Sequence, residues 1–169
     1  MRYAWVVCSL MIVLTAACSG TPPSRAPTDI TALTPNATLV KVVDGDTIDV
    51  LVHGRKERVR LIGIDTPETK KPNTPVQCFG PEASAFTAAL LPKGIALYLE
   101  RDVEPRDPYD RLLAYVYLAD GTFVNLEIVR QGYAHALTIA PNIAHSSEFV
   151  HAAHDAHAAD AGLWGKCSG

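Results

Sequence analysis

The chain has 169 residues, of which 48% are hydrophobic and 20% are charged, and its formal net charge at pH 7 is −3. This length suits one domain with a hydrophobic core of its own. The acidic balance excludes a surface that is basic throughout, so a polyanionic partner would have to be bound by a few placed arginines, helped by a cation.

The N-terminal segment has the pattern of an export signal. Ala4 to Ala17 are almost wholly apolar and follow Arg2, but the stretch is too short for a stable membrane span. Small residues then lead into Cys18, as in bacterial lipoproteins whose cysteine is acylated; ordinary signal-peptidase cleavage is the alternative. We therefore expect residues 1–17 to be a signal peptide, and the protein to be exported, either secreted or anchored to the membrane through a lipid on Cys18.

The segment that follows Cys18 is rich in proline, threonine, serine and alanine and has almost nothing to bury. Such a composition cannot offset the entropy lost when a chain is ordered, so residues 18–37 are predicted to be a disordered tether. The folded domain is predicted to span residues 38–169.

The first half of this domain has the pattern of three antiparallel strands. Thr38 to Val43 and Thr47 to Val52 alternate polar and apolar residues on either side of a hairpin turn at Asp44-Gly45. A third strand is predicted from Glu57 to Ile64. A loop with three prolines and no apolar period then runs from Thr66 to Gln77.

The second half combines two more strands with three helices. A proline and an acidic residue favour a helix start at Gly80, and Pro92 ends that helix. The other predicted elements are strands from Ile95 to Glu100 and Leu112 to Leu118, and helices from Phe123 to Gln131 and from about Ser146 to Ala161. Five short strands and three helices predict an α+β fold built on a small closed β-barrel of the OB type.

Carboxylates gather at two of the predicted strand ends. Asp44 and Asp46 flank the hairpin glycine, and Asp65 and Glu68 follow the third strand. Hard divalent cations prefer carboxylate and carbonyl oxygens, so these strand ends would form a Ca²⁺ or Mg²⁺ site if they met. Each short motif is also common in ordinary turns, so neither indicates a site alone.

Arg60 is an arginine inside an apolar strand. Strict alternation would aim Arg60 and Asp65 at opposite faces, so their convergence needs a bulge, for which Gly63 is a natural position. A partly buried guanidinium needs an anion, either an internal carboxylate, Asp65 or Asp46, or a substrate phosphate. A second arginine, Arg111, begins the last strand.

Two cysteines, Cys78 and Cys167, remain when Cys8 leaves with the signal and Cys18 is set aside for the lipid. In an oxidising compartment an even remainder indicates one disulfide, and two free or buried thiols are the alternative.

Five motifs in order, DGDT, RxxxxDTPE, GPEASAFT, YxRxLAYVY and ADGxxVNxxxVRQG, resemble the staphylococcal nuclease family. The resemblance covers nearly everything from Thr38 to Trp164. It implies an OB barrel with three helices and Ca²⁺-dependent hydrolysis of DNA and RNA, leaving 3′-phosphates. We expect a monomer that meets the membrane only through its lipid anchor.

The resemblance also implies the metal ligands. Asp46 and Asp65 would bind Ca²⁺ through their carboxylates, and Thr66 through its backbone carbonyl. Asp44 would contact the metal through water or support its ligands.

The remaining implied roles concern the substrate. Glu68 would activate or orient the attacking water, while Arg60 and Arg111 would clamp the phosphate and stabilise its growing charge. Tyr109 would line the nucleotide pocket.

The chain departs from the family where Leu137, Thr138 and Ile139 stand in place of an aromatic residue that stacks on the nucleotide. This departure implies weaker substrate binding or a changed base preference. The alternative to a nuclease is a catalytically silent OB-fold module that binds nucleic acid or a protein. Such a module would have no reason to retain Asp46, Asp65, Glu68 and both arginines together.

Overall fold

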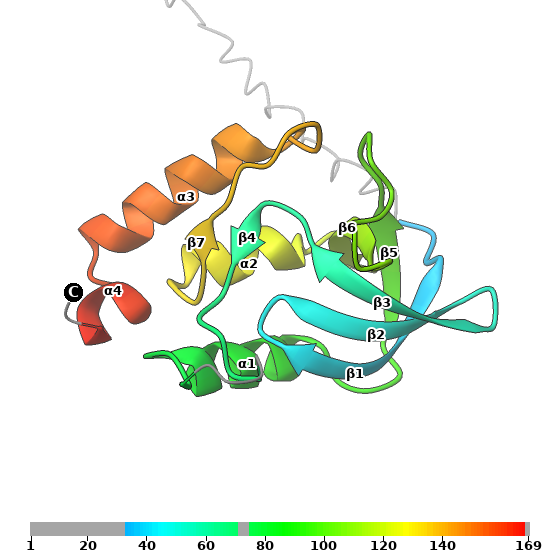
Figure 1. The fold of residues 1–169 in the computed structure, drawn as a ribbon, viewed down its shortest axis with the longest axis horizontal. Coiled ribbons are helices and arrows are strands. Elements are labelled where there is room, and N and C mark those ends of the chain that lie inside the picture. The colour runs from blue at the N-terminus through cyan, green and yellow to red at the C-terminus, as the bar shows by residue number, and fades with distance from the viewer. Residues whose placement is uncertain (1–32, 71–74, 168–169) are drawn as a thin grey trace, which may run out of the picture.

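Five strands form a closed barrel in the structure, a computed structural model that describes residues 33–70 and 75–167 (Figure 1). The barrel strands are β1 (Ala37–Asp44), β2 (Thr47–Val52), β3 (Arg55–Leu61), β5 (Ala96–Glu100) and β6 (Leu112–Leu118). Around the barrel they follow the order β1-β2-β3-β6-β5. The other elements are the paired strands β4 (Ile64–Asp65) and β7 (His135–Ala136), and the helices α1 (Gly80–Leu90), α2 (Val124–Arg130), α3 (Ser146–Ala158) and α4 (Leu163–Lys166). The predicted five-stranded barrel with three helices is confirmed, and α4 and the paired strands β4 and β7 are additional.

Alternation along the strands explains why the barrel closes. Ile48 and Val50 of β2 and Val59 of β3 are completely buried, while Arg58 and Arg60, on either side of Val59, are charged. Side chains of successive residues point to opposite faces of a strand, so each strand contributes one apolar face to the interior. Parallel pairing of β3 with β6 closes the ring.

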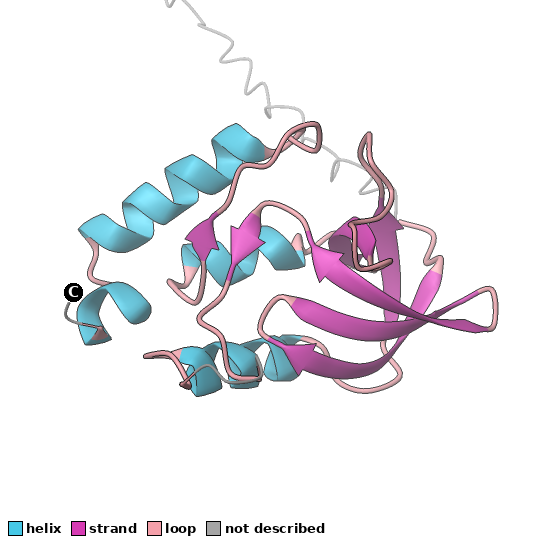
Figure 2. Ribbon diagram, in the orientation of Figure 1, coloured by secondary structure: helices cyan, strands magenta, loops and turns pink. Residues whose placement is uncertain are grey.

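The helices cover the barrel on the side away from the β2–β3 turn (Figures 1 and 2). The helix α1 packs beside β1, and α3 packs on α2 and β7. The helix α3 buries one apolar face, formed by Phe149, Ala152 and Ala156. That helix ends at Ala158, three residues before the predicted end.

The third strand differs from the prediction, because β3 ends at Leu61 and a two-residue turn at Ile62 and Gly63 precedes β4. Gly63 has a φ of 83°, and a Cβ there would lie 2.2 Å from the ring of Phe149. Only glycine fits this backbone conformation and this space. The expected bulge is therefore wrong: the chain turns, and β4 leaves the barrel to pair with β7.

The fold begins slightly earlier than residue 38. The side-chain amide of Asn36 donates to the carbonyl of Leu99 at 3.0 Å and accepts its N–H at 2.8 Å, and Ala37 pairs with Leu97 in the barrel. The predicted signal peptide and Cys18 lie outside the described residues. Within the described residues, none of the helices combines the length and apolar character needed to cross a bilayer.

Candidate active site

A polar cleft at one end of β1 to β4 brings all eight predicted active-site residues together. Its lining contains four acidic and four basic side chains. The acids are Asp44, Asp46, Asp65 and Glu68, the bases are Arg58, Arg60, Lys70 and Arg111, and Thr66 and Tyr109 complete the predicted set. Because equal numbers of acids and bases cancel, the lining has no net formal charge.

The β1–β2 turn holds the buried acid Asp46 against the end of β4. One carboxylate oxygen of Asp46 accepts the hydroxyl of Thr47 at 2.9 Å, and the other accepts both the N–H and the hydroxyl of Thr66 at 3.0 Å. Gly45 allows this approach, since a Cβ at Gly45 would lie 2.7 Å from the Thr66 hydroxyl oxygen. The glycine of the DGD motif is therefore required by contact between two strand ends.

Arg60 bridges the carboxylates of Asp46 and Asp65. Its Nη2 lies 2.9 Å from Asp65 and 3.2 Å from Asp46, and its Nη1 donates to the carbonyls of Leu61 and Ile64 at 2.7 and 2.8 Å. The side chain is only 14% exposed. Arg60 therefore pairs with both of the internal carboxylates that the sequence offered as its anion. It can contact Asp65 because the chain turns after β3.

The pKa values of two of the acids lie above their usual value. Burial raises the pKa of Asp65 against the opposing effect of Arg60, and the negative charge of Asp46 adds to the rise. Burial, followed by a hydrogen bond with Glu68, raises the pKa of Asp44. A site in which carboxylates are hard to ionise together is one that a cation would stabilise.

The fit of a metal ion rests on Asp46, Asp65 and Thr66. Among the described residues, no group of three His, Cys, Asp or Glu side chains forms a ready metal site. The predicted set has two carboxylates and one carbonyl, which suit a hard cation such as Ca²⁺ better than a soft one. Arg60 already lies between the two carboxylates, at the position where a cation would neutralise both.

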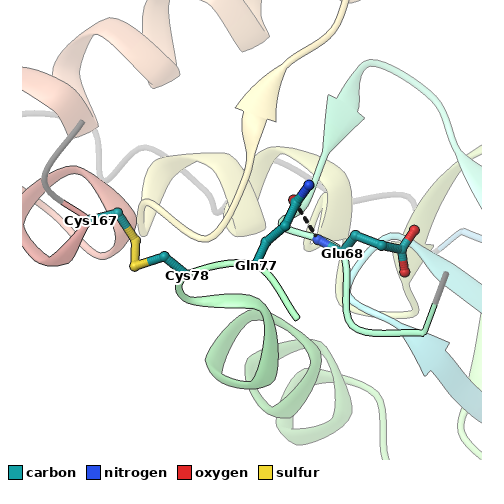
Figure 3. Close-up of a disulfide and its surroundings, with 4 residues drawn as sticks. All are labelled: Glu68, Gln77, Cys78 and Cys167. Atoms are coloured by element: carbon teal, nitrogen blue, oxygen red, sulfur yellow. Dashed lines mark hydrogen bonds between the residues drawn. A yellow bond between two sulfur atoms is a disulfide. The ribbon is translucent and has the colours of Figure 1, made fainter. Parts of the chain in front are cut away.

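The backbone of Glu68 is held by Gln77, a residue that sequence reasoning missed (Figure 3). The Glu68 N–H donates to the Gln77 side-chain oxygen at 2.8 Å, and the Gln77 N–H donates to the Glu68 carbonyl at 3.0 Å. The next residue, Cys78, forms the predicted disulfide with Cys167, which follows α4. In Figure 3 the Glu68 carboxylate points away from Gln77. The disulfide and Gln77 together fix where the Glu68 side chain starts.

Arg111 is positioned by Asp107, a second residue that the sequence motifs did not indicate. One oxygen of Asp107 accepts Nε of Arg111 at 2.6 Å, and the other accepts the N–H groups of Arg111 and Tyr109. Although burial opposes ionisation, these bonds from Arg111 hold the pKa of Asp107 below its usual value. The guanidinium lies 5.4 Å from the ring centre of Tyr109.

A largely apolar cavity adjoins the cleft. It shares Arg60, Tyr109 and Arg111 with the cleft, and its further walls include Leu137 and Ile139. The aliphatic residues that mark the departure from the family therefore lie beside the two arginines.

A family model described as staphylococcal nuclease homologue matches residues 58–166, more than half of the chain. The chain belongs to the staphylococcal nuclease family. The match includes Arg60, Asp65, Glu68 and Arg111, whereas the β1–β2 turn with Asp46 precedes it.

Curated relatives in the staphylococcal nuclease family carry nuclease names. A thermonuclease from Staphylococcus intermedius is 52% identical over 102 residues, which are 60% of each chain. A thermonuclease from Staphylococcus hyicus is 40% identical over 126 residues, which are 75% of this chain and 73% of the relative. Endonuclease YncB from Bacillus subtilis (strain 168) is 39% identical over 150 residues, which are 88% of this chain and 68% of the relative.

Proposed function

We propose that the protein is a Ca²⁺-dependent endonuclease that hydrolyses phosphodiester bonds of DNA and RNA and leaves 3′-phosphates. The observation that carries this proposal is the meeting of acids from two strand ends with Arg60 and Arg111 in one cleft. The names of the relatives support the reaction class. A silent binding module would not need Asp46, Asp65, Glu68, Arg60 and Arg111 together, so this combination counts against that alternative.

Arg60 and Arg111 bind and polarise the scissile phosphate. Nη1 of Arg60 donates to two carbonyls, and Nη2 is shared between Asp46 and Asp65. Nη2 can therefore turn to a phosphate oxygen once a cation takes its place at the two carboxylates. Arg111 uses Nε on Asp107, which leaves its terminal nitrogens for the same phosphate. Donors held in place before reaction stabilise developing negative charge without reorganisation.

Glu68 orients the attacking water and accepts its proton. As the water oxygen bonds to phosphorus, the bond from phosphorus to the 5′ oxygen breaks, and the 3′ side keeps the phosphate. The 5′ oxygen leaves with the bonding electron pair and takes a proton from solvent water, which gives a 5′-hydroxyl. Asp46, Asp65 and the Thr66 carbonyl would hold Ca²⁺, with Asp44 as a supporting acid, and the ion would supply positive charge beside the phosphate. The cavity lined by Tyr109, Leu137 and Ile139 would take the adjoining base.

We further propose that the protein acts outside the cytoplasm as a monomer. The apolar N-terminal segment, its small residues before Cys18 and the disulfide all support export. Metabolic labelling with a fatty-acid analogue, comparing the wild type with Cys18→Ser, would separate a lipid-anchored from a freely secreted form.

The activity is tested by incubating the purified protein with DNA and with RNA, in Ca²⁺ or in excess chelator. We expect cleavage of both polymers with Ca²⁺, 3′-phosphate ends by mass spectrometry, and no cleavage with chelator. Binding of either polymer without cleavage would establish the silent module instead. The Glu68→Gln variant is the control for a contaminating nuclease, since it should lose activity while remaining folded.

A further inference from the structure

Three cations surround one buried carboxylate on the outside of the barrel. The Asp49 side chain is 1% exposed, and it contacts Arg58 Nε at 2.9 Å, Lys56 Nζ at 3.1 Å and Lys41 Nζ at 3.9 Å. The three basic side chains are 49%, 56% and 57% exposed, respectively. Three positive charges around one negative charge leave a local excess of two, although the chain as a whole is acidic.

Strand register places these cations in line with the cleft. Lys41 of β1 and Arg58 of β3 both pair with Asp49 of β2. Alternation puts Lys56, Arg58 and Arg60 on one face of β3, with successive side chains about 6.7 Å apart. Arg58 lines the same cleft as Arg60. The row of cations therefore begins at the phosphate-binding arginine and continues outward along β3.

The carboxylate does not require so many partners. Burial would favour the neutral acid, but hydrogen bonds from Arg58 and Lys56 hold the pKa of Asp49 below its usual value, so it is ionised at neutral pH. One bonded cation already neutralises it. The positive charge of the other, half-exposed cations is therefore available to bind a polyanion. Such contacts to phosphates need no particular base sequence.

We propose that Lys41, Lys56 and Arg58 bind the phosphate backbone of a nucleic acid strand that leaves the cleft along β3. This inference rests on the proposed nuclease function, since the strand is the part of the substrate beyond the scissile phosphate. The surface holds a polymer at the cleft and contributes nothing to a substrate too short to reach it.

The test compares a two-charge variant, Lys41→Gln/Lys56→Gln, with a matched control, Arg130→Gln/Lys166→Gln. The variant leaves Arg58 to neutralise Asp49, and the control removes two exposed cations of α2 and α4 that do not line the cleft. For each protein, kcat/KM is measured on a long single-stranded DNA and on a trinucleotide at salt concentrations from about 50 to about 300 mM. Contacts to phosphates weaken strongly over this range.

For long DNA, we expect the slope of log kcat/KM against log salt to become less negative by about 1.4, since each lost contact to a single strand contributes about 0.7. The control should keep the wild-type slope, and the trinucleotide should be cleaved equally by all three proteins. Equal slopes for variant and wild type would overturn the proposal.

Two further measurements keep the outcomes distinct. If the double variant unfolds, as judged by circular dichroism, Lys56→Gln alone should change the slope by about half as much. If the wild type cleaves neither substrate, the proposed function fails. Fluorescence anisotropy with labelled single-stranded DNA then tests the surface alone, and an unchanged salt slope of Kd in the variant would overturn it.

Discussion

Gln77 hydrogen-bonds both backbone groups of Glu68, accepting its N–H at 2.8 Å and donating to its carbonyl at 3.0 Å. The Gln77→Ala substitution removes the first of these bonds, because the Gln77 side-chain oxygen accepts it. Because a displacement of about 1 Å near the reacting atoms can cost up to about 100-fold in rate, we expect kcat to fall about 10-fold with little change in KM. Gln77→Glu keeps an acceptor oxygen and should recover most of the rate. Steady-state kinetics of the two variants decide this, and equal activity in Gln77→Ala and the wild type would remove Gln77 from the mechanism.

The disulfide should stabilise the domain and support activity separately. It joins residues 89 positions apart, and in the chain-entropy model a loop of this length contributes about 4.6 kcal/mol to the free energy of unfolding. Urea unfolding of Cys78→Ser/Cys167→Ser should therefore show a loss of this order. At a temperature where the variant stays folded, kcat should also be lower, since Cys78 adjoins Gln77. A folded variant with wild-type kcat would show that the bond serves stability alone.

The arginine that Asp107 positions should act mainly in the transition state. Arg111→Lys keeps the positive charge but loses Nε, which bonds to Asp107, and the planar fork. We expect kcat to fall about 100-fold, as for removal of one preorganised donor, with a much smaller rise in KM.

Asp107→Asn provides the graded comparison, because it weakens the bond to Arg111 without touching the guanidinium. It should lower kcat about 10-fold at unchanged Ca²⁺ requirement. Wild-type kcat in folded Arg111→Lys would make Arg111 a surface residue.

Asp49 should contribute stability that depends on pH. Its pKa is lowered in the folded state, so the ionised form stabilises the fold above the ordinary pKa of 3.8, and this contribution is lost as the pH falls through the lower folded value. Asp49→Asn should cost about 1–3 kcal/mol at pH 7, as expected for hydrogen bonds to a charged group. Thermal unfolding from pH 7 to pH 2 should show the difference shrinking below about pH 4. A constant difference would mean that packing, not charge, accounts for it.

Alternating patterns and turn residues were sufficient to predict the barrel strands and α1 to α3, because each of these elements buries one face defined by its own sequence. The break after β3 was not predictable in the same way. Gly63 suggested an irregularity, but its form depends on the ring of Phe149, which is 86 positions away in the chain and occupies the space of a side chain.

The candidate site was predicted where chemistry is concentrated in short motifs, as with Asp46, Asp65 and Arg60. Gln77 and Arg58 were missed for a different reason. A glutamine in a loop and an arginine on an exposed strand face are ordinary solvent-facing residues in sequence, and only the pairing of Gln77 with Glu68 and the register of β2 with β3 gives them a role. Asp107 could have been found, since an aspartate four residues before an arginine is a local pair.

The disulfide between Cys78 and Cys167 also imposes an order of events on biosynthesis. Every element from α1 to α4 is translated between these two cysteines, so a ribosome must complete both strands β5 and β6 and the last helix before the bond can form. A nascent chain could close its barrel earlier, while the loop that begins with Glu68 still lacks its covalent anchor. Because the bond needs an oxidant, this last step in positioning Glu68 takes place only where the surroundings are oxidising.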